Sequence, residues 1–374
     1  APEPAPPAAV PPPPPAPETA PPPTQLKLEI PNGNSIRFGL LWQAQYEARG
    51  NPANDEYSQN LFLRRFALLI GGTVLEDFEY FFDSDFADLF RAGGDQSLKS
   101  GPAFQTKDAF ATYRAIDDQL KIDAGLLLPP GSHNSLQGGG TINGWDFFFN
   151  TFRHSAVFGS TANPYGRDVG VQLRGLVADG LLEYRAGIFQ GRRIPPDNDT
   201  PPSPGARNIF RVAGRVQLNF LDPETGFFYG GTYLGTKKIF SVGASGDFQY
   251  DEDGSYRTLS GDVLVDLPLG DDGFTAQVDV VHRDGGNVVD LPKQTFVGAE
   301  AGYRIGAAKL SPIVRFEKRW GDAPAGDETD FGGGLAWWAY GHNSNLKAFY
   351  TRLVPEEPAE AFNQFNLQWQ VHFY

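Results

Sequence analysis

Basic side chains recur on the polar face of several stretches in which apolar and polar residues alternate. Successive side chains of a strand point to opposite faces, so these residues face away from the apolar side. The set comprises Arg37, Lys121, Arg174, Arg185, Arg211, Arg215 and Arg315. Acids such as Glu47 and Asp262 share these faces. A wet passage lined by both signs admits ions and small polar solutes and selects them by charge and width. The same residues could instead brace a wall as cross-strand pairs, but for the arginines of 168–220 we expect transport.

Motifs of enzymatic chemistry are missing from the sequence, which contains no GxSxG, no P-loop and no HExxH. His133 or His154 near Asp146 could form an acid/base pair, although a loop histidine is more often a plain polar residue. The acids of 83–88 resemble a cation site but lack the glycine of an EF-hand loop, so a solvated strand end is preferred. Cysteine is absent, which excludes thiolate ligands and a Cys nucleophile. We therefore expect no enzyme, no cofactor and no metal.

The elements that carry the charges are strands. In the last, 363–374, aromatic and aliphatic residues alternate with Gln, Asn and His. This pattern suits the final strand of a closed barrel, which pairs with the first strand because the unpaired backbone groups of an open sheet edge are too costly in lipid. An edge strand of a soluble protein would show a similar pattern. Sixteen strands are expected, the first from 35, then 60–70 and 73–86 across a turn at Gly71-Gly72, 105–115, 119–128, 168–178, 181–190, 208–220, 238–250, 256–267, 273–283, 294–305, 308–319, 328–340, 345–353 and 363–374. Residues 227–235 are expected in an extended periplasmic turn or a strand extension, since a seventeenth strand would place the two ends on opposite sides.

Composition narrows the class of protein. With 40% hydrophobic and 20% charged residues and no run of about 18 apolar residues, the chain is neither disordered nor a helical membrane protein. The formal net charge of −14 argues against a nucleic-acid partner. Residues 1–23 form a Pro/Ala tract that favours polyproline II. We expect 1–34 to be a periplasmic segment that follows a removed signal peptide, and 35–374 to be the barrel.

A long irregular segment, 129–167, interrupts the strands. It contains an aromatic cluster around Trp145, the basic residues Arg153 and Arg167, and no lysine. Loops of this length inside a compact protein are usually functional or disordered, and the aromatic richness argues against disorder.

Six pieces of sequence, taken in order, carry a resemblance to a known family. They are residues 62–72, 77–85, 123–131, 166–175, 314–317 and 332–340. Over nearly all of 35–374 the chain resembles the phosphate-selective porin O and P family of outer-membrane channels. The resemblance implies a 16-stranded barrel in the bacterial outer membrane, a homotrimer, and a loop 129–167 folded into the lumen as a constriction. It also implies basic residues at the constriction that attract phosphate, a role that would fall to Arg153 and Arg167.

The sequence thus predicts an all-β, 16-stranded antiparallel transmembrane β-barrel with a long inward-folded loop. The expected function is passive diffusion of small hydrophilic solutes or ions, with an anion or phosphate preference. Expected partners are outer-membrane lipid and lipopolysaccharide, further copies of the chain, and the solutes. A second hypothesis is a structural tether whose Pro-rich arm binds peptidoglycan or a periplasmic partner. A third is a barrel enzyme or a soluble lectin-like sandwich.

Overall fold

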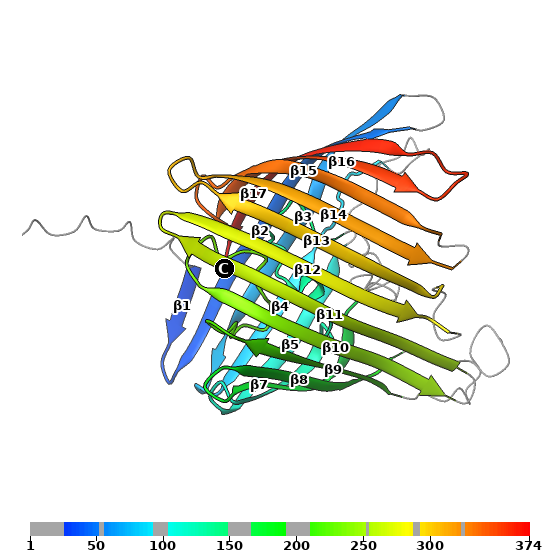
Figure 1. The fold of residues 1–374 in the computed structure, drawn as a ribbon. Coiled ribbons are helices and arrows are strands. Elements are labelled where there is room, and N and C mark those ends of the chain that lie inside the picture. The colour runs from blue at the N-terminus through cyan, green and yellow to red at the C-terminus, as the bar shows by residue number, and fades with distance from the viewer. Residues whose placement is uncertain are drawn as a thin grey trace, which may run out of the picture.

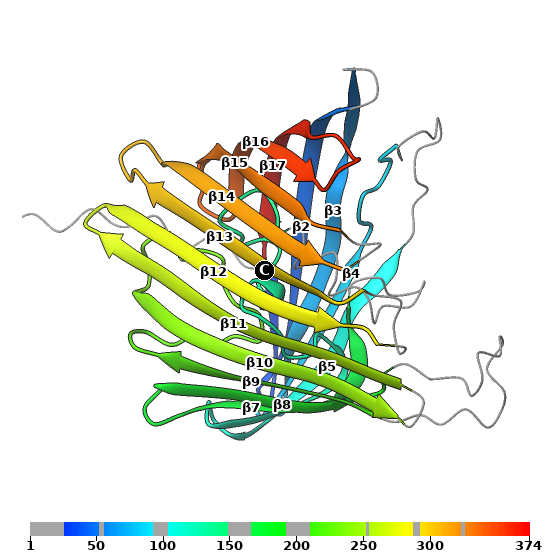
Figure 2. The same ribbon diagram turned by 45° about the vertical axis from the view of Figure 1, so that its right-hand side comes forward.

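Sixteen antiparallel strands close into a barrel in the computed structural model (Figures 1 and 2), which describes residues 26–51, 56–92, 104–148, 166–191, 210–251, 254–286, 292–322 and 326–374. The strands are β2 (Asn34–Gly50), β3 (Tyr57–Val74), β4 (Phe78–Asp85), β5 (Gln105–Ile116), β6 (Leu120–Leu127), β7 (Asp168–Val177), β8 (Leu182–Phe189), β9 (Arg211–Asn219), β10 (Ile239–Asp251), β11 (Gly254–Leu269), β12 (Asp272–Asp284), β13 (Gln294–Arg304), β14 (Leu310–Gly321), β15 (Glu328–Trp337), β16 (Ser344–Pro355) and β17 (Phe362–Phe373). Each strand pairs with the next, so the predicted strand number and fold class are confirmed.

The seam between the last strand and the first closes the barrel. β17 pairs antiparallel with β2 over ten residue pairs, from Gln364↔Arg49 to Phe373↔Leu40. On the outer face, Trp42 and Trp369 meet edge to face with ring centroids 5.3 Å apart. On the inner face, amide side chains of the two strands donate hydrogen bonds to each other, as from Gln43 Nε2 to Gln370 Oε1 at 2.7 Å and from Gln368 Nε2 to Gln45 Oε1 at 3.0 Å. The alternation predicted for 363–374 therefore separates a lipid-facing surface from a polar lumen.

A seventeenth strand, β1 (Leu26–Ile30), adds to the barrel from outside the cylinder of sixteen. It pairs with the beginning of β2, from Leu26↔Phe38 to Ile30↔Asn34, next to the point where β17 ends. Part of the expected 1–34 segment is thus attached to the sheet. The Pro/Ala tract, 1–23, lies outside the described residues, and its proposed peptidoglycan contact stays a prediction.

The turn between the second and third strands of the barrel was predicted in the wrong place. Strand β3 runs through Gly71 and Gly72 to Val74, and the turn follows at 75–77, where Leu75 and Glu76 have φ of 53° and 62°. The two glycines serve a close approach instead, because a Cβ at Gly71 would collide with the Tyr374 hydroxyl. One consequence is that Asp77 lies exposed in the turn and not on the inner face of a strand.

The connections differ in length at the two ends of the barrel. Short turns join most hairpins at the end that lies to the left in Figure 1, and longer connections lie at the other end. In barrels of this kind short turns are periplasmic and long loops extracellular. One connection at the short-turn end breaks this rule, the segment between β9 and β10. It contains residues 227–235, which form no strand, as predicted.

The outer wall is apolar along its middle. Val278, Val280, Phe316 and Leu335 all point outward and are 41%, 42%, 44% and 50% exposed. Inward-pointing neighbours on the same strands, such as Asp279, are buried. An apolar exterior around a polar interior is the arrangement that a barrel needs in lipid.

Arginine at Val278, in the middle of β12, is expected to destabilise the barrel by about 2–4 kcal/mol, because the charge would face the bilayer midplane. Equilibrium unfolding of Val278→Arg in lipid vesicles measures this loss, with Val278→Leu as the matched apolar control. Equal unfolding free energies for the two variants would show that this face does not lie in lipid.

Candidate functional site

A loop from the extracellular end folds across the lumen. We call its described part, residues 128–148, the constriction loop, and the predicted inward fold is confirmed for this part. The loop reaches the wall opposite to its own strands: Lys347 Nζ of β16 donates to the carbonyl oxygens of Ile142 and Gly144, both at 2.7 Å. Helical structure in the loop is one 3-10 turn, η1 (Asn134–Leu136), and no helix of the described residues is long and apolar enough to cross a membrane.

Arg315 of β14 and Glu300 of β13 fix the far half of the constriction loop. The guanidinium donates to Glu300 Oε2 at 2.6 and 2.9 Å and to the carbonyl oxygen of Phe147 at 3.1 Å. Glu300 Oε1 accepts hydrogen bonds from Asn143 Nδ2 and Gly144 N, both at 3.1 Å. The Glu300 side chain is fully buried, so this pair holds the loop in a place where water cannot replace either partner.

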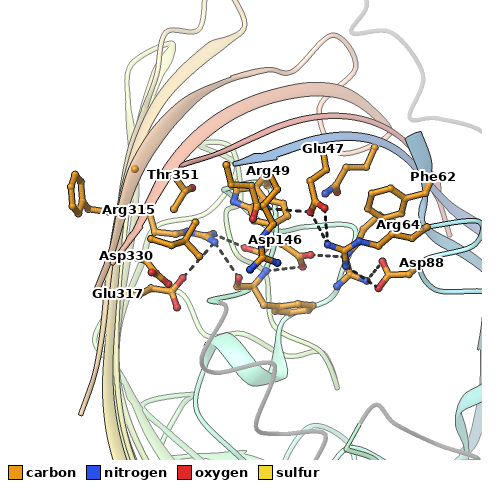
Figure 3. Close-up of a pocket in the computed structure, with 18 residues that line it drawn as sticks. Glu47, Arg49, Phe62, Arg64, Asp88, Asp146, Arg315, Glu317, Asp330 and Thr351 are labelled. Carbon is orange, nitrogen blue, oxygen red and sulfur yellow. Dashed lines mark hydrogen bonds and ion pairs between the residues drawn. The ribbon is translucent and has the colours of Figure 1, made fainter. Parts of the chain in front are cut away.

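Two adjacent arginines of β3 hold the loop through one carboxylate, that of Asp146, and Figure 3 shows the first of them, Arg64, directed at it. Arg64 Nε lies 2.7 Å from Asp146 Oδ2, and Arg65 NH2 lies 2.6 Å from Asp146 Oδ1. Burial alone would raise the pKa of Asp146, but the two guanidiniums outweigh it and hold that pKa well below its usual range. The carboxylate is therefore ionised at neutral pH.

A β-bulge explains how neighbouring residues on one strand can both face the lumen. The pairing of β2 with β3 passes from Gln43↔Arg65 to Ala44↔Leu63, which leaves Arg64 as the extra residue. A bulge re-aims a side chain in this way and breaks the two-residue period locally.

The segment between β9 and β10 enters the lumen from the short-turn end. We call residues 221–237 the lumen turn. Its Tyr229 is 1% exposed and forms a parallel bridge with Gln137 of the constriction loop. Its Glu224 lies 2.9 Å from His133 Nε2. Burial disfavours a charged imidazole, but the Glu224 carboxylate outweighs this and raises the pKa of His133, which favours the protonated ring. The sequence placed the segment in a turn but contained no sign that it folds inward.

Two cavities lie between the constriction loop and the wall. The outer cavity, about 340 Å³, is lined by Glu47, Arg49 and Arg91 near the extracellular end and by Thr351 of β16. The inner cavity, about 310 Å³, is lined by the glycines of 138–140 and by aromatic residues of the lumen turn and the barrel's short-turn end. Arg64 and Phe147 line both cavities. We call these two residues the neck.

Most of the basic residues predicted from the sequence are ion-paired on the inner wall. The nitrogen–oxygen distances are 2.6 Å for Lys121–Asp118, 3.0 Å for Arg167–Asp108, 2.9 Å for Arg174–Asp123, 2.8 Å for Arg185–Glu183, 2.5 Å for Arg211–Asp247, 2.6 Å for Arg215–Asp262 and 2.6 Å for Arg315–Glu300. Arg37 stacks on the Tyr374 ring at 4.0 Å, and Arg153 lies outside the described residues. Arg315 lines the outer cavity and Arg167 the inner one, and the part of both residues in transport stays a prediction. The ion pairs of the other predicted basic residues fit a role in bracing the barrel wall. Their role in transport stays a prediction.

Several lumen residues were not predicted from the sequence. Arg64 and Arg65 are adjacent in a strand whose apolar and polar residues otherwise alternate. This pair of charged neighbours was the one feature of the sequence that could have indicated a bulge. Lys107 faces the lumen and lies 3.1 Å from Asp83, one of the acids considered as a cation site. His133 pairs with Glu224 rather than with Asp146, and no local sequence signal links these positions, because 91 residues separate them.

Comparison with known proteins places the chain by its architecture. No protein-family model matches the sequence, and no curated protein does either. Solved porin structures do match. OprB of Pseudomonas putida has a TM-score of 0.60 and 10% identity over 90% of this chain and 94% of that one. The anion-selective porin of Comamonas acidovorans has a TM-score of 0.55 and 10% identity over 91% and 100%. OmpT of Vibrio cholerae in its trimer form has a TM-score of 0.54 and 11% identity over 91% and 100%.

These matches are to porins in general and give no specific support to the phosphate-selective family suggested by the sequence. At 10–11% identity they establish the architecture alone. The chain has the fold of the outer-membrane porins, a 16-stranded antiparallel barrel with a loop folded into its lumen.

Proposed function

We propose that the protein is a porin of the bacterial outer membrane, a passive diffusion channel for small hydrophilic solutes. The observation that carries this proposal is the pair of cavities that share Arg64 and Phe147 in their linings, inside a barrel whose exterior is apolar. Polar and charged side chains line both cavities, so water and dissolved ions are stable within them.

The route that we propose runs along one side of the lumen. Solutes enter the outer cavity beside Glu47 and Thr351, pass the neck, and leave through the inner cavity beside His372. The opposite side is more tightly filled, because the constriction loop and the lumen turn bond there to each other and to β8, β9 and β11–β13. The cavity lined by Arg211 and Tyr256 on that side holds about 40 Å³. Asp262 and Asp279, for example, accept hydrogen bonds from the backbone of the constriction loop at 3.1 Å.

The finer proposal is a mild anion preference without selectivity for phosphate. The inner cavity is lined by four cations, Arg64, Arg65, Lys107 and Arg167, and by two acids, Asp83 and Asp85. Each of the four cations has a carboxylate within 3.1 Å, which neutralises most of its field. Strong binding of a multiply charged anion needs several cations whose charge is not already balanced in this way.

Planar-bilayer recording tests the proposal. The purified protein is expected to insert as pores with an ohmic conductance in KCl and a reversal potential that indicates a small excess of chloride permeability. Addition of phosphate is expected to leave the chloride current nearly unchanged. A protein that inserts into the bilayer but conducts no ions would refute the channel, while a strong block by micromolar phosphate would refute only the weak selectivity.

We also propose that the protein forms a homotrimer embedded in outer-membrane lipid and lipopolysaccharide. The support is the shared fold, since the matching structure of Vibrio cholerae OmpT is described as a trimer form. Native mass spectrometry of the detergent-solubilised protein gives the oligomeric state, and a monomer alone would exclude the trimer.

A further inference from the structure

The lumen turn and the constriction loop come from opposite ends of the barrel and meet in its interior. Their backbones bond as neighbouring strands do. Gly138 N donates to Tyr229 O at 2.9 Å, and Tyr229 N donates to Leu136 O at 3.0 Å. Further along, Gly231 N donates to Thr141 O at 3.1 Å. Residues 136–141 of the constriction loop are therefore bonded to the lumen turn, in addition to the contacts that the loop makes with itself and with the barrel wall.

The side chain of Tyr229 joins this contact to the wall. Its ring stacks on His133 with centroids 4.7 Å apart and an interplanar angle of 6°. Its hydroxyl donates to Glu183 Oε1 at 2.9 Å, and the Arg185 guanidinium lies 4.4 Å from the ring centroid. A buried tyrosine that satisfies its hydroxyl and packs both faces fixes the position of its backbone.

The carboxylate of Glu224 makes the second connection. One oxygen pairs with His133 Nε2 at 2.9 Å, and the other accepts from Tyr233 OH at 2.6 Å and from Gly230 N at 3.2 Å. The side chains of Glu224 and His133 are each 1% exposed. An ion pair this deeply buried is costly to break from one side, because the remaining charge has no water to solvate it.

The lumen turn has its own anchors to the barrel. Asp266 of β11 accepts hydrogen bonds from Thr232 Oγ1 at 2.8 Å and from Tyr233 N at 2.9 Å. His342, between β15 and β16, lies 3.0 Å from the carbonyl oxygen of Thr232. The turn is thus tied to two separate parts of the wall, which makes it a rigid support for whatever it contacts.

We propose that the lumen turn positions the constriction loop from the periplasmic side, and that Glu224 and Tyr229 are its positioning residues. The inference rests on the proposed channel function and deepens it. The size of the passage is then set by two segments instead of one. A loop that lost this support would keep its anchors to β11–β14 and β16 but would move at 138–141, beside the inner cavity.

Glu224→Ala and Tyr229→Ala are expected to produce pores whose current fluctuates between levels, including levels above the wild-type conductance. Thr236→Ala is the matched control, since the Thr236 hydroxyl bonds only to Tyr233 O within the turn, at 2.7 Å, among the contacts that the structure shows. Its pores should remain as steady as those of the wild type. A difference in gel mobility between unboiled and boiled samples checks that each variant is folded.

A reversible cross-link separates positioning from a general loss of stability. The chain contains no cysteine, so Gln137→Cys/Tyr229→Cys introduces a single disulfide between the two bridge partners. The oxidised protein should conduct steadily, and a reducing agent should start the fluctuations in the same pore. Steady currents in both states, or in folded Glu224→Ala and Tyr229→Ala, would overturn the inference while leaving the channel intact. A wild-type protein without pores would instead refute the proposed function.

Discussion

Replacement of Arg315 by alanine should destabilise the barrel by about 3–5 kcal/mol, because it leaves a buried carboxylate without its cation. Glu300, whose side chain is 0% exposed, would lose the guanidinium that it meets at 2.6 Å. The constriction loop would also lose a donor to Phe147 O. Denaturant unfolding in lipid vesicles measures the first effect, and single-channel noise measures the second.

Arg319→Ala is the matched control for this prediction. Arg319 lies on the same strand and face as Arg315, and its guanidinium bonds to the Gly326 carbonyl oxygen and to Glu328, the first residue of β15. Its removal should leave the conductance steady. A partial recovery of stability in Arg315→Ala/Glu300→Gln would support the orphaned charge as the cause, because the glutamine side chain is neutral. An Arg315→Ala barrel as stable and as quiet as the wild type would contradict it.

The neck should set the conductance of the whole channel. Phe147 is 9% exposed and lies between the two cavities, with the Arg65 guanidinium 5.3 Å from its ring. Phe147→Ala is expected to raise the single-channel conductance, on the order of twofold if the neck is the narrowest point in series, and Phe147→Trp to lower it.

A lipid-facing phenylalanine supplies the control for the neck. Phe316 is 44% exposed on the outer wall, so Phe316→Ala removes the same ring without touching the passage. Its conductance should equal that of the wild type. If both substitutions at Phe147 left the conductance unchanged, the current would have to follow another route.

Regular alternation made most of the barrel predictable from sequence. In β12 and β17 every second residue faces lipid, so a charged or amide residue between apolar ones could be assigned to the lumen. The number of strands could also be predicted, because short turns that contain Gly or Asp separate the alternating stretches. The error at Gly71-Gly72 arose because glycine marks close packing as well as turns, and sequence alone does not separate these uses.

Non-local contacts account for what the sequence did not reveal. The ion pair of His133 with Glu224 and the support of Asp146 by Arg64 and Arg65 join positions that are 80 or more residues apart. No periodicity connects such positions. The inward fold of 129–167 was expected only because of a resemblance, and the fold of 221–237 into the lumen was not expected at all.

Cysteine accessibility during current recording tests the proposed route most directly. A bulky charged thiol reagent is predicted to reduce the current through Thr351→Cys, in the outer cavity, and to leave the current through Thr275→Cys unchanged. Thr275 is 7% exposed and bonds to Asp266 and Thr232 on the filled side of the lumen. Block at Thr275→Cys with no effect at Thr351→Cys would contradict the route and with it the central claim, that solutes cross the barrel through the two cavities that meet at the neck.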